Sequence, residues 1–430
     1  MKLKYMLGLG VGLALGFLGA QSASATPSSN EIVVGQSPVT DRDRQSFSEQ
    51  WEAIARLKGI SIDAAYAKYE PEIDADTHLN EIRSVFGSDL LRIGFRGDEN
   101  VVAPIELLLT VANPLSTQER EVLTRLELNT VVTVDPSILS EDTLSAINVN
   151  LFLGLLDNVG DIPLQTSPDA YTNDLHFTIG GSAIPQASGG TSEQTARTLD
   201  PVTLQAIRDY LAANVPAGVG VFLTVDPTLA ETAQSATTYI SGGDNALAAG
   251  CNAAFTVKVP NYVGVVTTSH CAGLIPTYEG MPTTNGAAVP LLKGDMTVLK
   301  LPTGIATPNF VTGVSSSVDI TAVAAPTTGN TVCIFQHGLV PATQCDTVMD
   351  TLVCKNRDDG VHGCDLATTQ HAFTVAGDSG SGWYSGSIAF GVHWGQYTEF
   401  GLYHSAFGRA SALAAFGIHV VTTADVIGIA

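Results

Sequence analysis

The chain changes its pattern of hydrophobic and polar positions near residue 240. Before that point, stretches with apolar residues at helical spacing alternate with short apolar runs typical of buried strands. After it, short β-like runs are separated by Gly, Pro, Thr and Ser, as in β-sandwiches and barrels. The pattern predicts an N-terminal α+β region followed by an all-β region.

The N-terminal region contains a pattern that occurs twice. Residues 41–70 first predict two short helices with a break at 58–61, and strands are expected at 90–97 and 104–112. A helix followed by a strand that contains Thr-Val-Asp-Pro is then predicted twice, as helix 115–127 with strand 130–137 and as helix 199–213 with strand 220–228. We interpret these as a duplicated α/β unit. The alternative is a chance resemblance of the two strings.

The C-terminal region predicts several short strands from runs of apolar and β-branched residues. Near its end, residues 405–421 space their apolar positions as a short helix followed by a last strand. The predicted strands before that helix are 253–259, 262–268, 295–301, 330–336 and 385–395. We therefore expect a strand-rich C-terminal domain.

Residues 1–25 have the pattern of a secretory signal peptide. Lys2 and Lys4 precede an uncharged run from Tyr5 to Ala20, and small residues suit cleavage after Ala25. A membrane anchor is the alternative, but the apolar run is short and rich in glycine, and nothing later in the chain reaches spanning length. With 45% hydrophobic and 14% charged residues, the chain can form two or three folded domains. We expect a secreted, extracellular protein with no membrane association after signal removal.

Charge and cysteine content narrow the possible partners and ligands. Acidic residues outnumber basic ones 42 to 20, which disfavours nucleic acid as a partner. The excess is concentrated in residues 26–239, which hold 30 acidic and 12 basic residues. All six cysteines follow residue 250, and an even number in an exported protein predicts disulfides. A zinc site is the alternative, but the chain has no Cys-x-x-Cys pair, so no metal is expected.

A glycine-rich turn around Ser379 is the strongest candidate for catalytic chemistry. Its sequence is Gly-Asp-Ser-Gly-Ser, and the glycines allow a tight turn in which backbone N–H groups point at one spot, as an oxyanion hole requires. A serine nucleophile also needs a base and a group that orients the base. His270 ends an apolar strand beside Cys271, and Asp295 stands directly before a strand of alternating apolar residues. We predict that Ser379, His270 and Asp295 are the nucleophile, the base and the orienting carboxylate.

These motifs, in this order, resemble the bacterial chymotrypsin-like serine proteases of the streptogrisin and α-lytic group. The matching strings are ISGGD at 240–244, TTSHC at 267–271, GDMTVLKL at 294–301, GDSGS at 377–381 and the terminal segment 405–421. The resemblance covers about residues 240–430. It implies two six-stranded antiparallel β-barrels with a C-terminal helix, and a serine endopeptidase that acts on polypeptides without a cofactor.

The resemblance assigns roles to individual residues. Ser379 would attack the scissile carbonyl, His270 would transfer the proton, and Asp295 would hold the imidazole in the required tautomer. The backbone N–H groups of Gly377 and Ser379 would bind the oxyanion. The substrate backbone would pair with the strand that holds His393, Trp394 and Gly395.

The resemblance also implies the pairing of the cysteines. One disulfide would tie the first strand to the histidine motif, a second would close a later hairpin, and the third is left by subtraction. The implied pairs are Cys251–Cys271, Cys333–Cys345 and Cys354–Cys364.

By analogy with secreted relatives, residues 26–239 would be a pro-region that assists folding and is then removed. The mature catalytic domain would be residues 240–430, released by cleavage between Tyr239 and Ile240. A β fold with mostly non-local contacts folds slowly, so a folding template has a physical rationale. A permanently attached accessory domain is the alternative.

The chain departs from the pattern of many relatives at three positions. Ser381 replaces the second glycine of the motif, Phe373 stands where a cysteine is usual, and Ile334 replaces an arginine that pairs with the aspartate of the loop. The geometry of the specificity pocket is therefore open, and so is the partner of Asp378. The candidates for that partner are His337, Arg357 and the amino group of Ile240.

Two residues near the serine are similar to those that contact a glutamate side chain in glutamyl endopeptidases. They are Thr374 and His393. A histidine can donate a hydrogen bond to a carboxylate and adds charge if it is protonated, whereas a packing histidine on a barrel strand is the alternative. Self-cleavage after Tyr239 would instead favour an aromatic or apolar pocket. A glutamate preference would select the bond Glu231-Thr232 for processing.

The sequence as a whole predicts a secreted serine endopeptidase made as a preproenzyme. Its partners would be polypeptide substrates and its own pro-region, residues 26–239. Two other functions remain open: a catalytically inactive binding module, and an esterase that uses the same three side chains. The presence of Ser379, His270 and Asp295 together argues against the inactive module.

Overall fold

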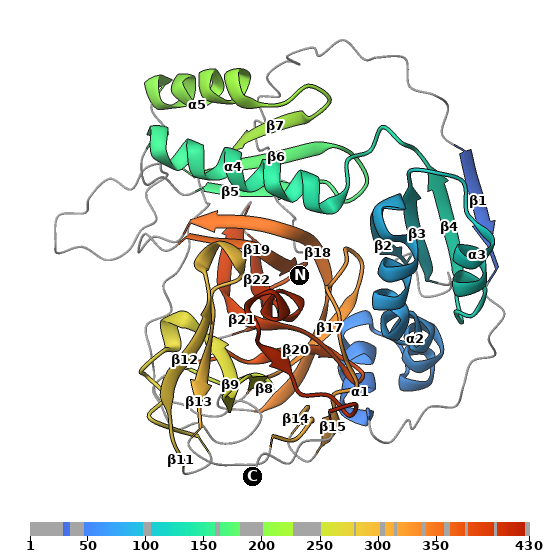
Figure 1. Cartoon of the computed structure of the whole chain (residues 1–430), viewed down its shortest axis with the longest axis vertical. Coiled ribbons are helices and arrows are strands. Elements are labelled where there is room, and N and C mark those ends of the chain that lie inside the picture. The colour runs from blue at the N-terminus through green and yellow to red at the C-terminus, as the bar shows by residue number, and fades with distance from the viewer. Residues whose placement is uncertain are drawn as a thin grey trace, which may run out of the picture.

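The protein consists of a helix-containing N-terminal part and a strand-rich C-terminal part (Figure 1). In the computed structural model the described residues are 29–34, 47–97, 105–159, 164–180, 201–226, 251–278, 281–301, 306–313, 316–336, 341–356, 362–374, 377–399 and 402–425. We call residues 29–226 the N-terminal part and residues 251–425 the C-terminal part. The predicted signal peptide and the predicted Tyr239–Ile240 boundary lie outside the described residues. No helix in the described ranges combines the length and the hydropathy that a membrane span requires.

The first unit of the N-terminal part packs helices against a sheet with strand order β1-β4-β3-β2. Strands β2 and β3 are antiparallel, whereas β3 and β4 are parallel and are joined through helix α3. Helix α3 begins with a capping box in which Ser116 and Glu119 bond each other's backbone N–H groups. The elements are β1 Ser29–Val33, α1 Ser48–Lys58, α2 Ile62–Phe86, η1 Gly87–Asp89, β2 Leu90–Arg96, β3 Glu106–Val111, α3 Thr117–Thr124 and β4 Asn129–Val134.

The second unit has the same order of helix, antiparallel strand pair, helix and parallel strand. Strands β5 and β6 are antiparallel, and β6 pairs with β7 in parallel across helix α5. The elements are α4 Glu141–Val159, β5 Leu164–Pro168, β6 Asp174–Ile179, α5 Pro201–Asn214 and β7 Gly220–Val225. The sequence pattern had not predicted α4, β5 or β6, and it ended the second helix at residue 70 rather than at Phe86.

The C-terminal part begins with a sheet of strand order β12-β13-β9-β8-β23. Two small hairpins, β10–β11 and β14–β15, lie outside this sheet. The elements are β8 Thr256–Val259, β9 Tyr262–Thr268, η2 Ser269–Cys271, β10 Thr277–Tyr278, β11 Met281–Pro282, β12 Thr284–Val289, η3 Leu291–Lys293, β13 Met296–Lys300, β14 Asn309–Val311, β15 Ser317–Asp319 and β23 His419–Val420. Strand β23 closes this sheet with residues from the end of the chain, as the terminal segment predicted.

A second sheet completes the C-terminal part and closes on itself. The pairings run β17-β20-β21-β22-β19-β18, and β18 also pairs with β17, so that six strands form a ring. The elements are β16 Ala322–Val323, β17 Thr331–Gln336, β18 Ala342–Asn356, β19 His362–Thr369, β20 Gly382–Ser385, β21 Ile388–Glu399, β22 Leu402–Arg409 and η4 Ala410–Phe416.

The C-terminal part is strand-rich, as the sequence predicts. The finer prediction of two six-stranded barrels is not confirmed, because the first sheet contains five strands within the described residues. The predicted terminal helix is the 3-10 helix η4, and residues 405–409 before it belong to strand β22.

The predicted disulfides are confirmed. All six cysteines are bonded, as Cys251–Cys271, Cys333–Cys345 and Cys354–Cys364. Because each sulfur is bonded to another sulfur, the cysteines cannot serve as thiolate ligands to zinc.

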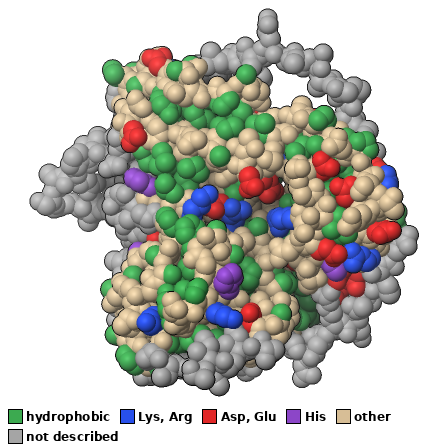
Figure 2. Space-filling model, viewed as in Figure 1, with side chains coloured by type: hydrophobic (Ala, Val, Ile, Leu, Met, Phe, Trp, Pro, Cys, Tyr) green, Lys and Arg blue, Asp and Glu red, His purple; other side chains and the backbone are tan. Residues whose placement is uncertain are grey.

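The two parts of the chain share a sheet and hydrophobic cores. Strand β5 pairs with β18, through Thr166 opposite Cys354 and Gln165 opposite Lys355, so the sheet β5-β6-β7 continues the second sheet of the C-terminal part. The core of the second unit includes Cys354 and its bonded partner. Figure 2 shows charged side chains of both signs gathered near the middle of this face of the molecule.

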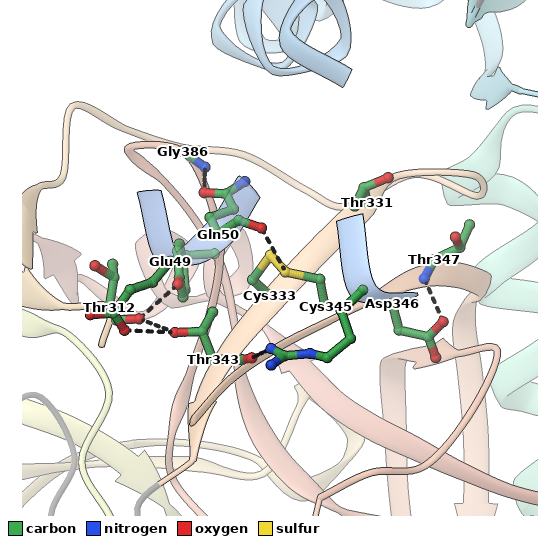
Figure 3. The surroundings of a disulfide bond; sticks show 12 residues. Glu49, Gln50, Thr312, Thr331, Cys333, Thr343, Cys345, Asp346, Thr347 and Gly386 are labelled. Atoms are coloured by element: carbon green, nitrogen blue, oxygen red, sulfur yellow. Dashed lines mark hydrogen bonds between the residues drawn. A yellow bond between two sulfur atoms is a disulfide. The ribbon is translucent and has the colours of Figure 1, made fainter. Parts of the chain in front are cut away.

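Helix α1 covers the β17–β18 hairpin at a second contact (Figure 3). The carbonyl oxygen of Gln50 lies 3.9 Å from the sulfur of Cys345, and its side-chain oxygen accepts the N–H of Gly386 at 2.9 Å. Arg56 donates to the carbonyl of Thr343 at 3.1 Å. The contact between the two parts is therefore built from apolar packing and specific hydrogen bonds.

Candidate active site

The predicted base and orienting carboxylate lie side by side because β9 and β13 are neighbours. Thr268 at the end of β9 pairs with Met296 at the start of β13, and the N–H of Ser269 donates to the carbonyl of Asp295 at 3.1 Å. His270 follows in η2, where its Nδ1 lies 3.4 Å from Asp295 Oδ2. The histidine side chain is 25% exposed and the aspartate side chain is 1% exposed. The imidazole is therefore partly exposed, with its Nε2 3.3 Å from the hydroxyl of Thr268, while its aspartate partner is buried.

Asp295 occupies an unusual backbone conformation. Its φ is +51°, in the left-handed region that residues other than glycine rarely adopt. The preceding Gly294 has a φ of +112°. Strain of this kind costs free energy and persists where the surrounding structure enforces it, often at functional sites. Here two strand pairings and the bond to Ser269 enforce it.

Ser379 lies against the residue that follows His270. Its carbonyl oxygen accepts the N–H of Asn252 at 2.6 Å and lies 3.8 Å from the sulfur of Cys271. The bond Cys251–Cys271 thus joins the strand before β8, the histidine turn and the serine loop at one point. The structure therefore places the backbone of Ser379 beside Cys271, the residue that follows His270.

Asn252 braces the serine loop, a role that the sequence analysis missed. Its amide nitrogen lies 2.8 Å from the carbonyl of Gly377 and 2.8 Å from the hydroxyl of Ser381. Ser381, the departure from the usual second glycine, therefore has a partner in this loop. A Cβ at Gly380, where φ is +89°, would lie 2.0 Å from the carbonyl oxygen of Asn252, so this position requires glycine.

The carboxylate of Asp378 accepts a hydrogen bond from an amide. Gln336 Nε2 donates to Asp378 Oδ2 at 3.0 Å and to the carbonyl of Phe373 at 2.7 Å. The three candidates named from the sequence, His337, Arg357 and Ile240, lie outside the described residues. Gln336 could have been identified from the sequence. Residues two apart on a strand point to the same face, and Gln336 is two residues after Ile334, the position where relatives have the arginine that pairs with this aspartate.

His393 is a buried, neutral side chain. It is 0% exposed, and Trp383 Nε1 donates to its Nδ1 at 3.4 Å. Burial, together with the nearby His270, lowers the pKa of His393 to about 3. Because Nδ1 accepts a hydrogen bond from the indole N–H, the hydrogen of the neutral imidazole is on Nε2. This Nε2–H has no hydrogen-bond partner within the described residues. The suggestion that His393 adds positive charge is therefore not supported, whereas its capacity to donate is.

The other predicted pocket residues lie on or beside β21 and β22. Thr374 is buried, and its hydroxyl lies 2.9 Å from that of Ser405 and accepts a hydrogen bond from Gln396 at 3.1 Å. A Cβ at Gly395 would meet no atom of the described residues within 4 Å, so there is room at this position. The indole of Trp394 points inward and is 1% exposed. The oxyanion role of Gly377 and Ser379 stays a prediction.

The structure shows a histidine bonded to a buried aspartate, near a Gly-Asp-Ser-Gly turn, where the resemblance to chymotrypsin-like serine proteases led us to expect the active site. The chain is 29% identical over 197 residues to Serine protease 1 of Streptomyces fradiae. The matched region covers 42% of this chain and 52% of that protein. The chain thus spans about half the length of this curated relative. No protein-family model matches the chain.

Among solved structures, the chain is similar to three proteases of this class. A glutamic acid specific serine protease that uses a histidine triad in substrate binding is 22% identical, with a TM-score of 0.36 over 42% of this chain and 100% of that chain. Protease A of Thermobifida fusca is 24% identical, with a TM-score of 0.35 over 43% and 100%. An α-lytic protease homologue is 21% identical, with a TM-score of 0.35 over 42% and 98%. The sequence similarity to Serine protease 1 of Streptomyces fradiae confirms the predicted resemblance to bacterial chymotrypsin-like serine proteases.

Proposed function

We propose that the chain is a serine endopeptidase that cleaves peptide bonds through an acyl-enzyme on Ser379. The observation that carries this proposal is the contact between His270 Nδ1 and the buried carboxylate of Asp295, with the serine loop against Cys271. The carboxylate favours the tautomer in which Nδ1 holds the proton, so that Nε2, which lies 3.3 Å from the hydroxyl of Thr268, is the nitrogen that would accept the proton of Ser379. Polypeptides would be the substrates.

The reaction would proceed in two halves. The hydroxyl of Ser379 attacks the scissile carbonyl and gives its proton to His270 Nε2, which passes it to the departing amine as the carbon–nitrogen bond breaks. Water then gives a proton to the same nitrogen and attacks the acyl-enzyme. That proton returns to the Ser379 oxygen as the acid product leaves. Backbone N–H groups of Gly377 and Ser379 would stabilise the negative oxygen in both halves.

We further propose that the protein is secreted as a precursor. Residues 1–25 would be the signal peptide, 26–239 the pro-region and 240–430 the catalytic domain, with cleavage between Tyr239 and Ile240. Three disulfides favour an oxidising compartment. Strand β5 adds to the edge of β18, which is how a folding template would hold an unfinished sheet. If residues 26–239 stay attached instead, they are an accessory domain.

A preference for glutamate before the cleaved bond is supported by His393. Its Nε2–H is a buried donor with no partner in the described part of the chain, and an unpaired buried donor is costly unless a ligand uses it. A carboxylate is the strongest acceptor that a side chain of the substrate can bring to it. Thr374, which is buried with its hydroxyl 2.9 Å from that of Ser405, would line the same pocket.

A serine-directed fluorophosphonate probe tests the enzymatic proposal. We expect labelling of Ser379 in the secreted protein, loss of labelling in Ser379→Ala, and at least a hundredfold slower labelling in His270→Ala, where the base is missing. A native protein that is never labelled would instead be a binding module. Activity on small esters alone, with none on peptides, would identify an esterase.

A further inference from the structure

The indole of Trp394 and the imidazole of His270 reach the same carboxylate oxygen. Trp394 Nε1 lies 3.0 Å from Asp295 Oδ2, and His270 Nδ1 lies 3.4 Å from that atom. An indole nitrogen can only donate, so Trp394 gives its N–H to the carboxylate. The other oxygen, Oδ1, is buried and has no hydrogen-bond partner among the described residues. The side-chain bonding of Asp295 therefore converges on Oδ2.

A bulge in strand β21 aims Trp394 at this oxygen. Pairing with β22 matches His393 to Phe407 and then Gly395 to Ala406, so that Trp394 is an extra residue with no opposite partner. The extra residue interrupts the regular alternation of side chains, and here His393 contacts Trp383 while Trp394 reaches Asp295. Bulges commonly redirect a side chain next to an active site.

The indole is fixed in place by close packing. Its ring belongs to a buried cluster with Val353, Leu366, Tyr397 and Ala406. Gly363 leaves room for it, since a Cβ there would lie 3.2 Å from Trp394 Cζ2. The ring of six strands thus supplies a rigid donor, and the first sheet of the C-terminal part supplies the acceptor.

We propose that Trp394 is a positioning residue that holds the carboxylate of Asp295 in the orientation that serves His270. This inference rests on the proposed function, in which His270 is the base. Within the described residues, the bond from Trp394 is the one that opposes rotation of the carboxylate away from the imidazole. Its loss slows proton transfer in both halves of the reaction and leaves substrate contacts in place.

The test removes the donor, and one of its two variants also keeps the fused ring. Both variants are made in the full chain, which is secreted and processed as in the wild type. One is Trp394→Phe. In the other, benzothienylalanine replaces Trp394, so that sulfur takes the place of the indole N–H. Because a hydrogen bond to a charged group is lost, kcat should fall by about tenfold to a hundredfold, with KM within about twofold of wild type. The acid limb of the pH profile of kcat/KM should also move. The matched control is Tyr397→Phe, which changes the same cluster and should leave kcat, KM and the pH profile unchanged.

A spectroscopic readout separates this inference from the proposed function. In the full chain carrying Ser379→Ala and 15N-labelled tryptophan, the added change Asp295→Asn should shift the Nε1–H resonance of Trp394 and leave that of Trp383 in place. An unshifted resonance, or unchanged kinetics in both donor-free variants, overturns the positioning role. Parallel loss of activity and melting temperature with an unmoved pH profile also overturns it, because packing alone then accounts for the effect. If wild-type protein hydrolyses no peptide or ester, the proposed function fails, and the resonance still decides whether Trp394 donates to Asp295.

Discussion

Glu72, on helix α2, accepts hydrogen bonds from both the backbone N–H and the hydroxyl of Thr331, the first residue of β17. The carboxylate is completely enclosed where the N-terminal part meets the C-terminal part, and Asp76 stands one helical turn away with a bond to Asn330 at 2.8 Å. Burial raises the pKa of Glu72 to about 7, against smaller lowering effects of Thr331, Asn330 and Lys58. Burial and the nearby Glu72 raise the pKa of Asp76 as well.

The stability of the joined protein should therefore depend on pH. A carboxyl whose folded pKa is raised contributes stability that is complete below its unfolded pKa, near 4.5, and is lost as pH rises to its folded pKa, near 7. We expect the melting temperature of the uncleaved Ser379→Ala chain to fall between pH 5 and pH 7.5. One such group contributes a slope of up to about 1.4 kcal/mol per pH unit.

The matched pair for this test is Glu72→Gln against Glu52→Gln. The first keeps acceptor and donor atoms next to Thr331 and removes the titration, so the slope should become shallower. Glu52 is exposed on helix α1, and its replacement should leave the slope unchanged. Equal slopes for both variants in calorimetry across this pH range would contradict the assignment to Glu72.

Asn252→Ala should loosen the serine loop. Its side chain donates to Gly377 and Ser381, and loss of two buried hydrogen bonds typically costs about 1 to 3 kcal/mol. We expect a lower urea midpoint and about tenfold slower labelling of Ser379 by a fluorophosphonate. Ser381→Gly removes only one of the two partners and should give a smaller change in both measurements. If Asn252→Ala labels as fast as wild type, the loop does not depend on this brace.

His393→Ala should weaken cleavage after glutamate selectively. Removal of a hydrogen bond to a carboxylate lowers kcat/KM for glutamyl peptides by about tenfold to a hundredfold, with a smaller effect on glutaminyl peptides. Because the pKa of His393 is about 3, its ring stays neutral from pH 6 to pH 8, and the wild-type preference should be constant over that range. Kinetics on matched glutamyl and glutaminyl peptides measure both effects. Equal loss on all substrates would reject the pocket role.

Trp383→Phe tests how the tautomer of His393 is set. The indole of Trp383 donates to Nδ1 and so leaves the hydrogen on Nε2. Without it both tautomers become available, and glutamate selectivity should fall by less than in His393→Ala while general peptidase activity changes little. A selectivity equal to wild type would show that another contact fixes the tautomer.

Ser379→Ala should remain full length if the protein processes itself. The expected outcome is a secreted product that retains residues 26–239, seen by gel and by N-terminal sequencing, whereas wild type begins at Ile240. Normal processing of the variant would assign the cut to another protease. A wild-type start at Thr232 would instead fit self-cleavage after glutamate.

Most residues of the candidate site could be predicted from short sequence motifs, because their side chains lie next to the ends of strands. His270 and Asp295 could be paired from sequence since each flanks a recognisable strand. Trp394 was assigned only through its backbone, because no local pattern marks the bulge that turns its side chain inward. Gln336 carries no charge, whereas the resemblance led us to expect an ion pair for Asp378.

The missing elements of the fold have a similar explanation. Helix α4 buries Leu151 and Leu155 at helical spacing, but Val149 and Leu153 also pack against the same core. Apolar residues therefore surround much of the helix, and the period that identifies an amphipathic helix is blurred. The short strands β5 and β6 form by pairing with each other, and β5 also pairs with β18. Their own sequences contain no pattern that predicts this pairing.

The pairing of β5 with β18 bears on what a liberated catalytic domain would look like. Thr166 and Gln165 supply backbone partners for Cys354 and Lys355, and the ammonium of Lys355 donates to the side chain of Gln165 at 2.6 Å. Removal of the first 239 residues would expose the edge of β18 that pairs with β5, and it would expose the ammonium group of Lys355 to water. An antibody raised against that edge would tell the liberated enzyme from its precursor.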